Sequence, residues 1–212
     1  MKKETTALLI LAIITVAVLA VVGIAKYREH QHYFIYKGAN GDYRIESHTI
    51  GNVTDYYVYA LSENKLYLTP LRKTPQDVQN ISLEPNLLDK INRPKGVQRV
   101  YITQDYETAN ATGQLSIIAL QDIGKILGKA SYGIYKLNVQ GAFTHSTARS
   151  RDLDVPEISC ANVNETVSVI YLTLGQENKV YSDKDCIIVE GKDADGLTLA
   201  ANKFAYYLLG VF

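Results

Sequence analysis

The sequence predicts an α/β (α+β) fold, with an N-terminal transmembrane helix followed by a mixed-sheet domain that contains an N-terminal antiparallel meander and two main packing helices. Three observations support this prediction. Thr5–Ala25 is an uncharged apolar run of 21 residues. Residues 33–71 alternate between short stretches of β-formers and tight turns. The rest of the chain contains two units in which a strand pattern precedes a helical stripe, an order typical of helices packed on a sheet.

The run Thr5–Ala25 has the length of a membrane-spanning helix. At about 1.5 Å per residue, such a helix reaches about 30 Å, which matches the hydrocarbon core of a bilayer. A cleaved signal peptide is the alternative, because Gly23-Ile24-Ala25 could be a weak cleavage site, although the run is longer than a usual h-region. We expect an uncleaved anchor at residues 1–26 that contacts the lipid bilayer through residues 5–25.

Several weak signals indicate that the N-terminus is cytoplasmic and that the domain is extracytoplasmic. Basic residues flank the apolar run on both sides, with a slight excess of positive charge at the N-terminal side. The chain has two cysteines, Cys160 and Cys186, and an even count suits a disulfide in an oxidising compartment. Four glycosylation sequons begin at Asn52, Asn80, Asn110 and Asn164. We therefore expect a disulfide-bonded glycoprotein of the cell envelope.

Composition excludes one class of partner and suggests one globular unit. The chain has 22 basic and 22 acidic residues, a balance that gives no electrostatic footprint for nucleic acid. It has 16 Tyr, four Phe and no Trp, as expected for strand-rich exported domains. We expect a β-rich subregion at residues 27–71 and an α/β domain at residues 72–212, which together form one unit.

The β-rich subregion is predicted to be a meander of short antiparallel strands. Turn residues lie at Gly38–Asp42, Gly51-Asn52 and Ser62–Asn64. The expected strands are Tyr33–Tyr36, Tyr43–Ile50, Tyr56–Leu61 and Lys65–Leu68. After them, Leu71–Pro94 contains three prolines and room for one short helix at Pro85–Ile91. A functional loop is conceivable in this connection, but its residues identify no ligand.

The α/β domain is predicted to begin with a strand at Gln98–Thr103. Gln104–Asn110 is then expected to be a loop, and apolar residues between Leu115 and Leu127 recur at helical spacing until Gly128. Another strand is expected at Ile134–Val139, followed by a long polar loop, Gly141–Pro156.

The C-terminal part has the clearest pattern. Val167–Leu174 is a nearly continuous run of β-formers, typical of a strand covered on both faces. Two shorter strands are expected at Lys179–Tyr181 and Cys186–Glu190. A final helix is expected to begin after Asp193 as its N-cap and to end at Gly210.

Candidates for catalysis and metal binding are few. His30 and His32 adjoin the predicted anchor, and His48 lies in a predicted strand. His145 lies between Thr144 and Ser146, which is the one place where a Ser/His arrangement can be imagined, although the GxSxG elbow is missing. The acidic stretch Gly191–Gly196 lacks the EF-hand spacing and suits a helix N-terminus. We expect no metal and no cofactor.

The segment Asp185–Gly210 resembles the closing strand–helix unit of some archaeal cell-surface and S-layer-related proteins. Its strand leads through the turn Gly191-Lys192-Asp193 into a helix that ends in Leu208-Leu209-Gly210. The resemblance covers about 26 residues and implies an archaeal envelope protein of unassigned activity, without catalytic residues.

Three hypotheses about function follow. The first is a single-pass, membrane-anchored extracytoplasmic domain that acts as a binding module or accessory subunit of a cell-envelope complex. The second is a cell-envelope hydrolase that uses the 141–156 loop with His145 as its base. The third is a structural component associated with a surface layer.

Overall fold

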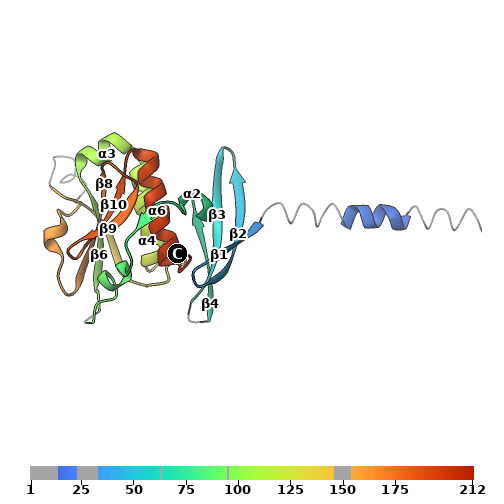
Figure 1. The fold of residues 1–212 in the computed structure, drawn as a ribbon, viewed down its shortest axis with the longest axis horizontal. Helices are drawn as coiled ribbons and strands as arrows, with labels where there is room; N and C mark the ends of the chain where they lie inside the picture. The colour runs from blue at the N-terminus through green and yellow to red at the C-terminus, as the bar shows by residue number, and fades with distance from the viewer. Residues whose placement is uncertain (1–13, 23–32, 63, 95, 146–153) are drawn as a thin grey trace, which may run out of the picture.

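The domain consists of two β-sheets with a helical layer between them. The computed structural model describes residues 14–22, 33–62, 64–94, 96–145 and 154–212. Two helices, α4 (Gln114–Leu127) and α6 (Ala194–Leu208), separate a four-stranded sheet from a six-stranded sheet (Figure 1). This arrangement confirms a mixed α+β fold with an antiparallel meander, a mixed sheet and two main packing helices.

The four-stranded sheet is the predicted meander. Its strand order is β1-β2-β3-β4, and every pair is antiparallel. Gly51, with a φ of +63°, forms the β2–β3 turn in a conformation that favours glycine. The bounds are β1 Tyr33–Gly38, β2 Gly41–Ile50, β3 Val53–Ser62 and β4 Lys65–Leu71.

The connection to the second sheet contains two short helical turns. Helix α2 (Pro75–Val78), which the sequence analysis missed, begins at a capping box in which Thr74 and Asp77 bond each other's backbone. The helix expected at Pro85–Ile91 is only a 3₁₀ turn, η1 (Leu87–Lys90). The two-residue strand β5 (Ser82–Leu83) lies between them.

The six-stranded sheet has the order β5-β9-β10-β8-β6-β7. Strands β7, β6, β8 and β10 are mutually parallel, whereas β9 is antiparallel to β10. The bounds are β6 Arg99–Gln104, β7 Asn138–Phe143, β8 Val167–Leu174, β9 Lys179–Asp183 and β10 Cys186–Gly191. The predicted strands at 98–103, 167–174, 179–181 and 186–190 are thus confirmed within one or two residues.

Two predictions for the first strand–helix unit are wrong. The strand expected at Ile134–Val139 begins only at Asn138 and continues to Phe143, because the backbone N–H of Ile134 and of Leu137 caps the C-terminal end of α4 instead of joining a ladder. The loop expected at Gln104–Asn110 contains helix α3 (Tyr106–Thr112). Its N-cap is Asp105, whose carboxylate accepts the backbone N–H of Thr108.

Helix α6 is buried over most of its surface. Eleven of its fifteen residues are buried, including Phe204 and Tyr206, because the mixed sheet covers one side and α4, α2 and the meander cover the others. The predicted N-cap is confirmed, since Asp193 accepts the backbone N–H of Gly196 at 2.7 Å. Ile45 and Val58 of the meander and Ile187 of β10 belong to the same hydrophobic cluster as α6.

A buried polar network joins the three layers. The side-chain amide of Asn202 on α6 donates to Asp122 of α4 at 2.8 Å. Its oxygen accepts the backbone N–H groups of Arg72 and Lys73, which follow β4, at 3.1 and 3.2 Å. Burial raises the pKa of Asp122, while Lys125, 2.6 Å away, favours the charged carboxylate. These contacts satisfy polar groups that would otherwise be costly at the centre of the domain.

The predicted disulfide Cys160–Cys186 is present. It ties η2 (Cys160–Asn162) to the start of β10, on the face of the mixed sheet opposite α4 and α6. Around it, Val169 and Ile188 form a second, smaller hydrophobic cluster that Ile158 helps to cover. The disulfide therefore holds a cover over the outer face of this sheet.

The predicted anchor Thr5–Ala25 lies partly outside the described residues. Residues 14–22 are helical and exposed. Among the helices that the structure describes, none is both long enough and apolar enough to cross a membrane.

We expect the double substitution Cys160→Ser with Cys186→Ser to lower the free energy of unfolding by about 3.5 kcal/mol, because the cross-link restricts the unfolded chain over a separation of 26 residues. Urea unfolding of the variant and of the wild-type chain measures the difference. Reductant should destabilise the wild-type chain and leave the double variant unchanged. Equal stability of the double variant and the disulfide-bonded wild-type chain would contradict the prediction.

Lys203 on α6 should make stability depend on pH. Burial lowers the pKa of its ammonium to about 8, and the face of the Phe212 ring, 3.3 Å away, offsets part of that cost. The unfolded chain, with an ordinary lysine pKa near 10.4, then binds the proton more tightly. Stability should therefore rise by about 1–2 kcal/mol as the pH increases through about 8 towards 10.

Lys203→Met should remove this rise, which urea unfolding monitored by circular dichroism at several pH values would measure. Lys192→Met, at an exposed lysine, is the matched control and should keep the wild-type slope. Identical slopes in wild type and Lys203→Met would contradict the prediction.

Candidate functional site

Polar side chains gather at both ends of the parallel strands of the mixed sheet. Glu165 and Asp185 precede β8 and β10, so they mark the amino ends. Asp105 follows β6, and His145 follows β7, so these two mark the carboxyl ends. In open α/β sheets, ligands usually bind at the carboxyl ends, but in this domain a hollow lined by six charged side chains lies at the amino ends.

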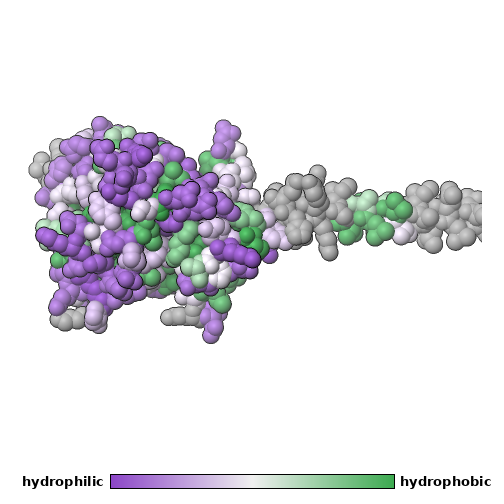
Figure 2. All heavy atoms as spheres, in the orientation of Figure 1, coloured by the Kyte–Doolittle hydropathy of each residue, from purple (hydrophilic) through white to green (hydrophobic). Residues whose placement is uncertain are grey.

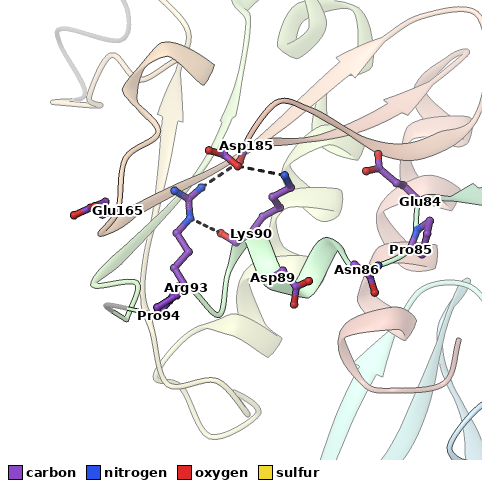
Figure 3. Close-up of a pocket in the computed structure, with 9 residues that line it drawn as sticks. All are labelled: Glu84, Pro85, Asn86, Asp89, Lys90, Arg93, Pro94, Glu165 and Asp185. Atoms are coloured by element: carbon purple, nitrogen blue, oxygen red, sulfur yellow. Dashed lines mark hydrogen bonds and ion pairs between the residues drawn. The ribbon is translucent and has the colours of Figure 1, made fainter.

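The hollow at the amino ends has a volume of about 710 Å³, within the range of small-molecule and peptide pockets. The connection between the two sheets forms one wall, and the turns before β8 and β10 form the other (Figure 3). We call it the amino-end pocket; its lining residues are Glu84, Pro85, Asn86, Asp89, Lys90, Arg93, Pro94, Glu165 and Asp185.

Two cations hold the walls of the amino-end pocket together. The ammonium of Lys90 donates to the carbonyl oxygen of Lys184 at 2.7 Å and to the Asp185 carboxylate at 3.2 Å. Arg93 donates through Nη2 to the carbonyl oxygen of Asp185 at 3.4 Å (Figure 3). Through Nη1 it also donates to the carbonyl oxygen of Asn164 at 2.7 Å. These bonds join the connecting segment to both turns, so the pocket has fixed walls.

Glu84 supplies a further fixed group at the edge of the pocket. Its carboxylate accepts the hydroxyl and the backbone N–H of Ser182, at 2.7 and 2.6 Å. These hydrogen bonds lower the pKa of Glu84, which therefore remains ionised at neutral pH.

The amino-end pocket carries an excess of negative charge. Four carboxylates line it, against the two cations Lys90 and Arg93, which leaves two formal negative charges. The cations already donate to carbonyl oxygens and to Asp185, whereas Asp89 is exposed at the rim. A site of this charge suits a partner that brings lysine or arginine side chains.

A second groove, of about 880 Å³, runs between α4 and the edge strand β7. Much of its lining is glycine and aliphatic side chain, and Lys125, one of its three cations, is bound to Asp122 and to the carbonyl oxygen of Pro70. Although it is the larger hollow, fewer charged groups converge on it than on the amino-end pocket.

At the carboxyl ends, Asp105 and Tyr171 form a close pair. The Tyr171 hydroxyl donates to the Asp105 carboxylate at 2.6 Å. Burial opposes ionisation of Asp105, but this bond and the Thr108 backbone N–H outweigh it and hold the pKa of Asp105 below its ordinary value. Burial, together with the same bond, raises the pKa of Tyr171. The pair locks α3 onto β8.

His145, the base in the hydrolase hypothesis, lies beside this pair. Its Nδ1 is 3.1 Å from the Thr144 hydroxyl, and its Nε2 is 3.8 Å from the Glu107 carboxylate. The side chains of His145 and Glu107 are 50% and 76% exposed, so the imidazole lies at the surface. Of the predicted polar loop 141–156, residues 141–143 belong to β7, and residues 146–153 lie outside the described residues.

The other predicted residues occupy scattered surface positions. The four sequon asparagines, Asn52, Asn80, Asn110 and Asn164, are all exposed. The acidic stretch before α6 is used structurally, because Asp193 caps the helix and Asp195 pairs with Lys73 at 2.8 Å. Over the described residues, no group of three or more His, Cys, Asp or Glu side chains is placed to hold a metal ion.

The fold and these sites define an α+β domain with an acidic pocket in its mixed sheet. Comparisons of the chain with protein-family models, with curated proteins and with solved structures gave no match. The resemblance of Asp185–Gly210 to archaeal cell-surface proteins therefore stays a prediction.

The amino-end pocket has no continuous signature in the sequence, because its residues come from three separate segments. The only local signal is the placement of charged residues directly before proline, as in Glu84-Pro85 and Arg93-Pro94. That pattern marks fixed turns, but it does not reveal that Glu165 and Asp185 lie opposite.

A double-mutant cycle should show coupling between Asp105 and Tyr171. Asp105→Ala removes both the N-cap of α3 and the acceptor of the tyrosine hydroxyl, and Tyr171→Phe removes the donor. We expect a coupling energy of about 1 kcal/mol at neutral pH, measured by urea unfolding. Because the folded-state pKa of Asp105 is lowered, the coupling should disappear as the pH falls through that pKa. Glu107→Ala is the control and should not couple to Tyr171→Phe.

Proposed function

We propose that the chain is a single-pass membrane-anchored protein whose extracytoplasmic domain acts by binding, as an accessory subunit of a cell-envelope complex. The observation that carries this proposal is the amino-end pocket, whose walls are held by Lys90, Arg93 and Glu84. Fixed walls reduce the loss of conformational freedom on binding, so the acidic rim is ready to receive a partner.

The chemistry of the pocket points to a basic segment of another envelope protein. Asp89 and Glu165 are exposed at the rim, and the two prolines of the lining add rigid apolar surface. A lysine or arginine side chain can lay its aliphatic stem along such a surface and place its charge near the carboxylates.

The location is supported by three independent features. The apolar run Thr5–Ala25 has the length and composition of a membrane anchor. The disulfide Cys160–Cys186 suits an oxidising compartment outside the cytoplasm. The four sequon asparagines are exposed, as glycosylation would require.

The two alternative hypotheses have less support. A general base needs a substrate pocket around it, whereas the imidazole of His145 is half exposed. A surface-layer component would assemble with copies of itself, and no feature of the described residues favours that assembly over binding of a basic partner.

The proposal can be tested with a photo-cross-linking amino acid at Pro94, which lines the pocket and is exposed. The full-length protein is irradiated in its native membranes, and adducts are identified by mass spectrometry. We expect an adduct whose cross-linked peptide contains lysine or arginine. The double substitution Asp89→Lys with Glu165→Lys should reduce its yield roughly tenfold, because it reverses the charge of the rim.

The matched control is Glu177→Lys, which reverses an exposed charge at the opposite, carboxyl end of the parallel strands. It should leave the adduct unchanged. The proposal fails if irradiation yields no adduct, or if Asp89→Lys with Glu165→Lys has no more effect than Glu177→Lys.

A further inference from the structure

The outer face of the meander, the face turned away from α4 and α6, is rich in exposed apolar side chains. Because side chains alternate along a strand, Ile45, Val58 and Leu71 point inwards and are fully buried, while their neighbours point outwards. The outer apolar residues and their exposed fractions are Ile35 52%, Ile50 83%, Val53 48%, Leu61 72%, Leu66 59% and Leu68 37%. Figure 2 shows hydrophobic surface at this end of the domain.

Four of these six side chains lie in two pairs at opposite ends of the sheet. Leu61 pairs with Leu66 beside the β3–β4 turn, and Ile50 pairs with Val53 beside the β2–β3 turn. Each pair places two apolar side chains next to each other on one face. A flat surface that touches the sheet at both ends would cover them together.

The centre of the outer face is polar, and its charged side chains pair with one another. The guanidinium of Arg44 lies 2.6 Å from the Glu46 carboxylate and 4.4 Å from the centre of the Tyr33 ring. His48 packs edge-on against Tyr57 with ring centres 4.7 Å apart. These residues border a shallow hollow of about 560 Å³. Tyrosine and arginine, with an apolar body and a polar tip, are suited to the headgroup level of a bilayer.

The chain itself brings this face close to the predicted anchor. The apolar run ends at Ala25, and β1 begins at Tyr33, which belongs to the outer face. The seven residues between them span at most about 25 Å. Such a short tether keeps the domain close to the membrane, and the strand that follows it presents Tyr33 and Ile35 on the outer face.

We propose that the outer face of the meander rests on the lipid bilayer, with its tyrosines and Arg44 at the headgroups and the leucine and isoleucine pairs inserted just below them. This inference rests on the proposed anchor. The face carries Lys37 and Arg44 against Asp42, Glu46 and Asp55, so it has no positive patch. Contact therefore depends on apolar and aromatic insertion rather than on anionic lipid.

The absence of Trp from the sequence allows a direct test, because one introduced Trp is a unique fluorophore. Leu66→Trp and Ile50→Trp are placed in the full-length chain, reconstituted at one copy per nanodisc with brominated phosphatidylcholine. We expect roughly twofold quenching of both, because the indole would reach the acyl region where the bromines lie. Ile117→Trp, at a position on α4 whose exposed fraction of 51% is close to the 59% of Leu66, is the matched control and should not be quenched.

Flotation of the wild-type chain with vesicles separates the two proposals. A chain that does not float overturns the anchor, and the membrane contact with it. A chain that floats but shows no quenching at residues 50 and 66 overturns only the contact. Trp that is shielded from aqueous iodide but not quenched by brominated lipid would indicate a protein partner on this face and would also overturn it.

Two further measurements test the physical basis of the contact. Leu61→Asp should abolish the quenching of Trp at position 66 without changing the circular dichroism, because it replaces the apolar partner of residue 66 with a charge. Quenching should be equal with and without anionic lipid and at low and high salt. Quenching that requires anionic lipid would overturn the apolar mechanism.

Discussion

The burial of helix α6 between the two sheets is the constraint on which the rest of the domain depends. Beyond its first turn, where Asp195 is exposed, the helix has no polar face towards solvent, so each buried polar side chain needs a partner inside the protein. Asn202 meets this requirement with a donor and an acceptor at once, towards Asp122 and towards the backbone after β4. The Asn202 amide therefore fixes the position of the meander relative to α4 and α6. Apolar packing alone would allow a wider range of positions.

The central helix also decides which faces of the two sheets need a cover. The mixed sheet turns one face to α4 and α6, and its other face is closed by the segment that Cys160–Cys186 holds in place. The meander turns Ile45 and Val58 to the helices, while its outer face remains open in the described part of the chain. The six large apolar side chains exposed there share one face, so they are not isolated surface residues. Packing inside the domain does not account for their exposure, which indicates a contact with something outside the domain.

The sequence predicts the elements whose signal is local. The meander follows from alternation and turn residues, and α6 follows from Asp193, an apolar stripe and Gly210. Helix α3 was missed because Asp105, its N-cap, resembles a loop residue until its bond to Thr108 is known. Strand β7 begins later than predicted, because the backbone N–H groups of Ile134 and Leu137 bond the last carbonyl oxygens of α4 instead of a neighbouring strand. Such choices depend on tertiary partners, which periodicity does not encode.

The candidate site depends on tertiary contacts even more than the fold does. Its charges lie in segments separated by up to about a hundred residues, and only the parallel order of β8 and β10 brings Glu165 and Asp185 to one edge. Sequence analysis could identify proline-bounded turns there, but it could not pair them across the sheet. In contrast, the cysteine pair was predictable, because a chain with two cysteines allows a single intramolecular pairing.

The proposed membrane contact gives the three layers an order away from the bilayer. The meander would lie at the lipid surface, α4 and α6 above it, and the mixed sheet with its amino-end pocket farthest out, where a partner can approach. In this arrangement the sequons are not equivalent. Asn110 and Asn164 belong to the outermost layer, whereas Asn52 lies between Ile50 and Val53, which would face the lipid. A glycan at Asn52 would hold that end of the sheet away from the headgroups, so membrane contact and glycosylation at Asn52 exclude each other for steric reasons.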